Sequence, residues 1–143
     1  MSVFGSLGPL LLTVAGGIVY HVSAKSLPKD LSPALVLIGA YAVALMACVV
    51  AYFVIPADNN GAPMSRVLHP AIVAVGLGAA MIEFGYVLTY RAGWPVSIAS
   101  VLVNSLVAVA LVIAGISIFN EGVSTPRIAG VALCLAGAWL LRG

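Results

Sequence analysis

A chain of 143 residues that is 63% hydrophobic and only 7% charged has more apolar surface than a soluble core of this size can bury. Its mean hydropathy is +1.21 and its formal net charge is +2, and charge this sparse excludes a nucleic-acid-binding protein. We therefore expect an integral membrane protein. Because the chain lacks the period-two alternation of a β-barrel, its apolar runs are expected to be spanning helices.

The apolar runs divide into five segments of about the length that crosses a bilayer. A helix needs about 20 residues to cross roughly 30 Å of hydrocarbon, and these runs are bounded by Pro, Asn, Asp or charged residues. The expected spans are residues 5–26, 33–55, 70–92, 95–119 and 126–141. The sequence thus predicts an all-α membrane protein, with residues 1–143 forming a single transmembrane domain.

The connections between these spans carry turn and capping residues. The longest, PADNNGAPMSRVLHP, is rich in Pro, Asn and Gly, whereas only RAGWP separates the third span from the fourth and predicts a tight hairpin. Before the fifth span, Ser124 or Thr125 is expected to cap the helix, and Pro126 falls where a missing amide costs nothing. The first apolar run has no basic segment before it and no clear cleavage site, so we expect a retained span.

The sequence carries no motif of enzyme chemistry. It has no phosphate-binding glycine loop, no HExxH and no nucleophile elbow. Its two cysteines, Cys48 and Cys134, fall inside predicted spans and are expected to be small packing residues, since two thiols alone make no metal site. No enzymatic activity, cofactor or metal is therefore expected.

The basic residues favour one orientation only weakly. Five spans place the two termini on opposite faces of the membrane, and these faces carry four and two basic residues: Lys25, Lys29, Arg91 and Arg142 against Arg66 and Arg127. Basic residues favour the cytoplasm, so the C-terminus is expected inside. A bias this small also fits a chain that inserts in both orientations.

One carboxylate, Glu83, lies inside a predicted span. An ionised carboxylate near the bilayer centre costs about 2.5 to 3.5 kcal/mol on insertion scales, and an ionisable group there is a functional-site hypothesis by default. We expect Glu83 to hold a proton and to exchange it for cargo. The alternative is a protonated Glu83 that hydrogen-bonds Asn104 or a tyrosine and only locks the helices together.

Other polar residues are expected close to Glu83 in depth. At 1.5 Å per residue, Glu83 lies about 12 Å from Arg91, and Asn104 lies about 13 Å from Pro95 on the next span. Polar residues at helical spacing form one stripe on each of the first four spans, including Tyr41 on the second. The expected substrate-binding residues are Glu83, Asn104, Tyr86, Tyr20 and Ser100, with Glu83 also coupling transport to protons.

Aromatic residues and one histidine lie near the expected span ends. Tyr90 and Trp94 are expected to be anchors at the membrane interface. His21, near Lys25, is either an interfacial residue or a ligand or proton relay. The sequence leaves the choice for His21 open.

The stretch YRAGWPVSIASVLVNSLVAVALVIAGISIFNEGVSTPRIAGVALCLAGAWLL resembles the last two spans of an EamA-type unit of the drug/metabolite transporter superfamily. The shared pattern is a small residue after the third span, VSIASVLVN opening the fourth, and an acidic loop residue, Glu121, before STPRIAGVALCLAGAWLL. The resemblance implies secondary transport of small metabolites or drugs in a bacterial inner membrane. Most members of this family fuse two five-helix units, so a single unit is expected to pair with an inverted copy.

The resemblance supplies no role for Glu83. The short four-span exporters of the superfamily place their essential glutamate on the first helix, where this chain has no carboxylate. Glu121 matches the loop acid of the family, and its position beside the start of the fifth span suggests a structural role. The role of Glu83 therefore rests on its place within an apolar run.

Two functions remain open. The first is a proton-coupled secondary transporter, an exporter or exchanger of a small organic metabolite or drug-like compound, working as a homodimer that can be antiparallel. The second is a non-transporting membrane subunit that packs against a partner complex. Small residues at helical spacing offer faces for close helix contact: Gly130, Cys134 and Ala138 in the fifth span, and Ala110 and Ala114 in the fourth.

Overall fold

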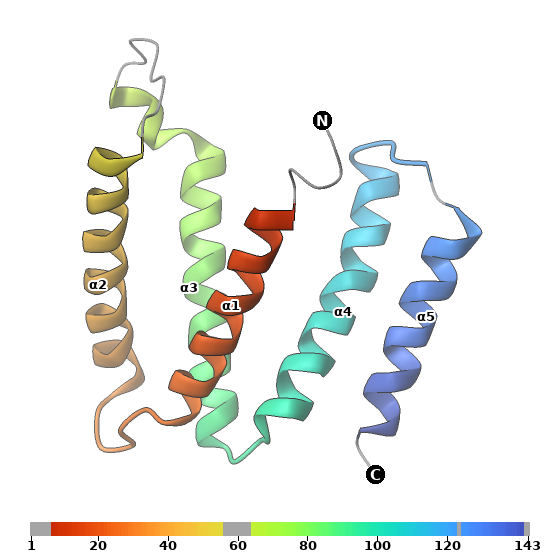
Figure 1. The fold of residues 1–143 in the computed structure, drawn as a ribbon, viewed down its shortest axis with the longest axis horizontal. Coiled ribbons are helices and arrows are strands. Elements are labelled where there is room, and N and C mark those ends of the chain that lie inside the picture. Colours follow the sequence, from red (N-terminus) through yellow and green to blue (C-terminus); the bar gives the residue numbers. More distant parts are fainter. Residues whose placement is uncertain (1–6, 56–63, 123, 142–143) are drawn as a thin grey trace. The chain divides into compact units, whose positions relative to one another are not determined.

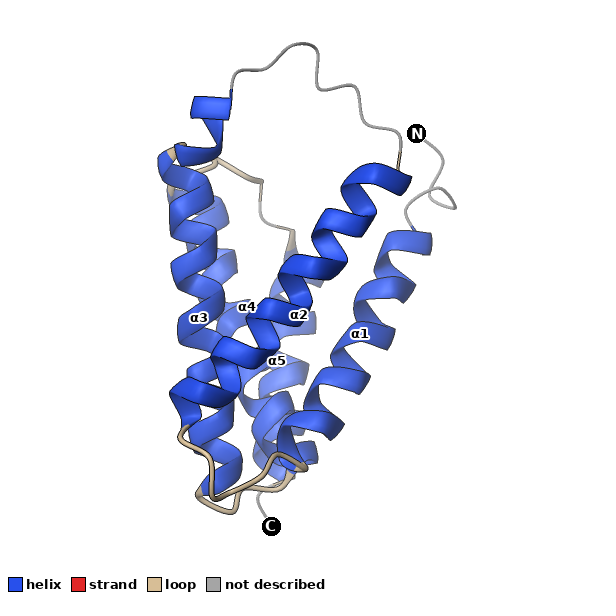
Figure 2. Ribbon diagram, turned by 90° about the vertical axis from the view of Figure 1, so that its left-hand side faces the viewer, coloured by secondary structure: helices blue, strands red, loops and turns tan. Residues whose placement is uncertain are grey.

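The computed structural model describes residues 7–55, 64–122 and 124–141, and this part of the chain is helical without any strand (Figures 1 and 2). Its helices are α1 (Leu7–Lys25), α2 (Pro33–Val54), the short 3-10 helix η2 (Met64–Leu68), α3 (Pro70–Arg91), α4 (Val96–Ser117) and α5 (Thr125–Leu140). The all-α architecture expected from the sequence is confirmed. The α-helices end within two residues of the predicted bounds, while η2, at the end of the long connection before α3, was not predicted.

Helix starts are fixed by local capping chemistry. At α2, the Ser32 hydroxyl accepts a hydrogen bond from the Leu35 amide at 3.2 Å, and Pro33 takes the first helical position. At α3, His69 Nδ1 accepts from the Ala71 amide at 3.2 Å. At α5, Ser124 occupies the cap position as expected but makes no side-chain capping bond.

Within the described residues, four helices, α1 to α4, are long and apolar enough to cross a membrane. Their length and composition make the chain an integral membrane protein. Helix α5 is apolar but has 16 residues, which span about 24 Å against roughly 30 Å of hydrocarbon. A fifth span therefore stays a prediction.

The chain groups into two compact units. The α2–α3 unit, residues 24–92, contains α2, η2, α3 and the last residues of α1; the α4–α5 unit, residues 1–23 with 93–143, contains the rest of α1 with α4 and α5. Helix α2 packs against α3, and α4 packs against α5 (Figure 1). That one transmembrane domain contains both units stays a prediction, and each unit is described by itself.

Arg91 ties the end of α3 to the loop that precedes α2. Its Nη2 donates hydrogen bonds to the carbonyl oxygens of Pro28 at 3.1 Å and Leu31 at 2.7 Å. Because the donor is charged, these are stronger than ordinary hydrogen bonds. The end of α3 and the start of α2 are therefore held at the same level, which sets the depth of every residue that faces between the two helices.

The end of α4 is built by a turn of its own backbone. Asn120 adopts a left-handed conformation with φ of 51°, which asparagine tolerates better than most residues, and the Glu121 amide donates to the Gly115 carbonyl at 2.9 Å. The Glu121 carboxyl lies over Gly115, where an added Cβ would be 3.1 Å from Oε2. Glu121 thus makes a structural contact with the end of α4.

Candidate functional site

Glu83 lies on α3, within a helix of membrane-spanning length, and its side chain is half-buried. Among the described residues, its carboxyl makes no hydrogen bond and no ion pair. A hydrogen bond between Glu83 and a tyrosine of the α2–α3 unit is therefore absent among the described residues, while the predicted bond to Asn104 stays a prediction. The carboxyl is available for another partner.

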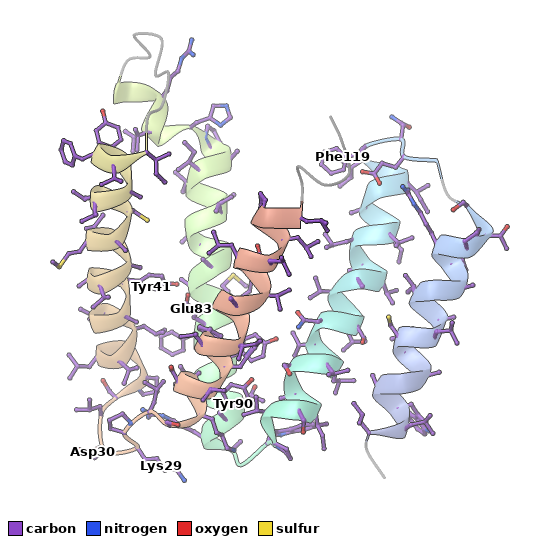
Figure 3. The ribbon with its side chains drawn as sticks, in the orientation of Figure 1. Lys29, Asp30, Tyr41, Glu83, Tyr90 and Phe119 are labelled. Carbon is purple, nitrogen blue, oxygen red and sulfur yellow. The ribbon has the colours of Figure 1, made fainter. Side chains whose placement is uncertain are left out.

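Tyr41 of α2 is the polar residue that faces Glu83. Figure 3 shows the Tyr41 side chain directed from α2 towards α3, where Glu83 lies, and the phenol and the carboxyl interact electrostatically. The Tyr41 hydroxyl is buried and has no hydrogen-bond partner among the described residues. Two polar groups without partners thus share the space between α2 and α3.

The positions of Tyr41 and Glu83 in the sequence already indicate that they lie at the same depth. Tyr41 is eight residues after Pro33, and Glu83 is eight residues before Arg91, so both lie about 12 Å into their helices. Arg91 holds these two helix ends together. The rise per residue, which placed Asn104 close to Glu83 in depth, therefore places Tyr41 at the same depth as well. From the sequence, Tyr41 was assigned only to a polar stripe.

Tyr86 and Tyr90 form a stacked pair further along α3. Their ring centroids are 5.7 Å apart with an interplanar angle of 25°, and Lys25 Nζ lies 5.9 Å from the centroid of the Tyr90 ring. Both tyrosines are buried, and Tyr90 is only 3% exposed. The prediction that Tyr90 anchors the membrane interface is wrong, because its ring is engaged within the protein.

Tyr20 lies on α1, in the α4–α5 unit, beside His21. Its ring meets the ring of His21 edge to face, with centroids 5.1 Å apart and an interplanar angle of 76°. Both side chains are half-buried. This contact does not decide between the interfacial and the proton-relay roles of His21.

Ser100 and Asn104 line one groove of about 290 Å³ between α4 and α5. Its six lining residues are Ser100, Val101, Asn104, Ser105, Ala108 and Cys134. Ser105 was not predicted as a site residue, although Ser105 directly follows Asn104 within the same turn of helix. Cys134 was predicted to be a packing residue, whereas the structure places this thiol on the wall of the groove.

One of the small residues of α5, Ala138, is buried within the chain. Cys134 faces α4 across the groove, and Ala138 is 2% exposed. The row of Gly130, Cys134 and Ala138 was predicted as a face for close helix contact, and only Ala138 is buried within the chain; Cys134 is exposed, so its use by a second copy stays a prediction.

The five predicted site residues are divided between the two units. Glu83 and Tyr86 belong to the α2–α3 unit, whereas Tyr20, Ser100 and Asn104 belong to the α4–α5 unit. The predicted cavity that joins Glu83 to Asn104 stays a prediction. Among the described residues, no group of three or more His, Cys, Asp or Glu side chains could hold a metal ion.

The chain matches no family model, no curated protein and no solved structure. The resemblance to an EamA-type unit therefore stays an interpretation of its sequence pattern. What remains is the chemistry of two polar regions within membrane-length helices. One can bind and release a proton at a carboxyl group, and the other offers neutral hydrogen-bonding groups.

Proposed function

We propose that the chain is a proton-coupled secondary transporter, an exporter or exchanger of a small organic metabolite or drug-like compound. The observation that carries this proposal is the half-buried Glu83 carboxyl, within a membrane-length helix, facing the phenol of Tyr41. Ionisable groups are expensive in hydrocarbon, and chains keep them there mainly for substrate, ion and proton pathways.

The proposed cycle exchanges one proton for one cargo molecule at Glu83. Without cargo, the carboxyl holds a proton. When cargo binds, the proton leaves to water on that side of the membrane, and the carboxylate holds the cargo while the Tyr41 hydroxyl donates a hydrogen bond to it. When cargo leaves on the other side, the carboxyl takes up a proton there, so an empty charged carboxylate never crosses the membrane.

A dimer is part of this proposal. Alternating access in many transporters uses two halves of opposite topology around one site, and a unit with an odd number of spans supplies only one of them. An antiparallel second copy would supply the other. The division of basic residues into four and two supports this, because so small a bias allows insertion in both orientations.

The test is flux in reconstituted vesicles, with an internal pH-sensitive dye reporting proton movement when amines, amino acids or sugars are added. We expect Glu83→Gln to reduce proton-coupled flux to background, because the amide cannot release a proton, while the thermal unfolding midpoint in detergent stays unchanged. Glu121→Gln is the matched control and should keep full flux, since Glu121 lies over Gly115 at the end of α4.

Two outcomes would contradict the proposal. Full flux in Glu83→Gln would remove this carboxyl from the mechanism. A folded wild-type protein that moves no proton and no solute across the whole panel would favour the alternative, a non-transporting subunit that packs against a partner complex.

A further inference from the structure

We propose that the groove between α4 and α5 is a binding site for a small uncharged polar solute, a molecule that offers hydroxyl or amide groups and carries no net charge. The proposal rests on the proposed transport function, to which it adds a substrate class. It draws only on residues of the α4–α5 unit.

The lining of the groove is uncharged and places several hydrogen-bonding groups in mostly apolar surroundings. Four of its six residues have side chains that make hydrogen bonds, Ser100, Asn104, Ser105 and the thiol of Cys134, and none of the six carries a formal charge. Its volume of about 290 Å³ is close to the lower end of the range of small-molecule pockets, about 300 to 1,000 Å³. A ligand the size of a small polyol or amide therefore fits.

Ser105 is the observation that points to a ligand. Ser100 and Ser117, on the same helix, donate to the carbonyl oxygens four residues back at 2.6 and 2.7 Å, which satisfies their hydroxyls where water is absent. Ser105 lines the groove, is only 7% exposed and makes no such bond among the described residues. Its hydroxyl thus lies at the groove with its hydrogen-bonding capacity unused within the described part of the chain.

Asn104 adds the strongest hydrogen-bonding group of the groove. Its carboxamide offers two donors and an acceptor, and none of them is used within the described part of the chain. The residue is eight positions into α4, about 12 Å along a helix of membrane-spanning length. An amide at that depth needs a partner, because hydrocarbon offers none. A hydroxyl or amide of a solute would supply one.

The neutral lining sets the charge of the solute. A charged molecule in this groove would lose its hydration without gaining an opposite charge from any lining residue. An uncharged molecule loses less favourable hydration, and hydrogen bonds to Asn104 and Ser105 compensate for that loss. The groove should therefore select against charge more strongly than against any particular polar group.

Cys134 provides a built-in reporter of occupancy. The chain has two cysteines, so Cys48→Ser leaves Cys134 alone on the groove wall, and Cys134→Ser leaves Cys48 on α2 as the control thiol. The probe is N-ethylmaleimide, added to purified protein with increasing myo-inositol, glycerol or acetamide. We expect at least one of these solutes to slow the labelling of Cys134 saturably, about tenfold at nine times its Kd, and to leave the labelling of Cys48 unchanged.

Charge and site variants complete the experiment. Gluconate and glucosamine, which are charged, should give no protection. Asn104→Leu and Ser105→Ala should abolish protection by the uncharged solutes while Cys134 still reacts with maleimide. Ser117→Ala is the matched control and should keep protection, because its hydroxyl bonds the Ile113 carbonyl outside the groove.

Several results would overturn the assignment. These are a Cys134 that maleimide never reaches in the folded protein, a labelling rate that none of the uncharged solutes changes, or equal protection by gluconate. Oxidative cross-linking of two chains through Cys134 would instead assign the groove to a helix of a second copy. Binding is measured here without flux, so the two proposals fail separately. Protection of Cys134 without transport would contradict only the proposed transport function. Transport without protection of Cys134 would contradict only the proposed solute site.

Discussion

In the α2–α3 unit the polar groups between the helices are ionisable, whereas in the α4–α5 unit they are neutral. Glu83 and Tyr41 can exchange a proton with their surroundings; Asn104 and Ser105 can only donate and accept hydrogen bonds. In hydrocarbon both kinds of group need a partner, but only a carboxyl can link its partner to a proton. The comparison therefore suggests that the α2–α3 pair exchanges its cargo for a proton, whereas the α4–α5 pair recognises neutral polar groups without a proton.

The two units are also held together differently. In the α2–α3 unit, the charged side chain of Arg91 bonds two carbonyl groups of the loop before α2. In the α4–α5 unit, the end of α4 is closed by backbone bonds through the left-handed Asn120, with Glu121 packed over Gly115. The loop before α2 is thus tied to α3 by one side chain, whereas the end of α4 is closed by its own backbone.

Removing the guanidinium is the strongest test of this contrast. Arg91→Gln loses two hydrogen bonds with a charged donor, so we expect the free energy of unfolding to fall by about 2 kcal/mol. The control Arg127→Gln loses one bond, to the Gly122 carbonyl at 3.2 Å, and should cost about 0.5 kcal/mol. Unfolding in mixed detergent micelles measures both. An equal decrease in the free energy of unfolding in both variants would show that the Arg91 hydrogen bonds stabilise the α2–α3 unit no more than the single Arg127 bond stabilises its loop.

The next test concerns the phenol that faces Glu83. We expect Tyr41→Phe to change the free energy of unfolding by less than about 0.5 kcal/mol, because the lost hydroxyl has no hydrogen-bond partner among the described residues. The same variant should slow proton-coupled flux several-fold, since the hydroxyl is proposed to donate to the cargo. Tyr52→Phe, on the exposed part of α2, should change neither quantity. Unchanged flux in Tyr41→Phe would show that the Tyr41 hydroxyl does not donate a functional hydrogen bond to the cargo.

The smallest expected effect separates two glycines of the α4–α5 unit. Gly130→Ala meets no atom within 4 Å and should stabilise α5 by about 0.5 to 1 kcal/mol, because alanine loses less conformational freedom in a helix. Gly115→Ala would place its Cβ 3.1 Å from Glu121 Oε2, so the carboxyl must shift and most of that gain should be lost. Detergent unfolding measures the difference. A clear loss of stability in Gly130→Ala would indicate that a second chain covers this face of α5.

Much of the architecture could be predicted because it is determined locally. The thickness of hydrocarbon fixes the length of a spanning helix, and residues such as Ser32 and Pro33 fix where it begins, so the predicted bounds lie within two residues of the observed ones. Depth along each helix follows from the rise per residue alone. For this reason, Glu83 could be recognised from the sequence as a carboxyl far from either end of its helix.

What the sequence by itself determined is therefore the class of protein, the extent of each helix and the depth of each polar residue. Tertiary structure alone decided which residues face each other: Tyr41 opposite Glu83, Tyr90 buried beside Lys25, and Ser105 and Cys134 in one groove with Asn104. The physical reason is that these helices are apolar on nearly every side. Such a helix has no single hydrophobic face to set its rotation, so neighbours are chosen by the packing of side chains between helices.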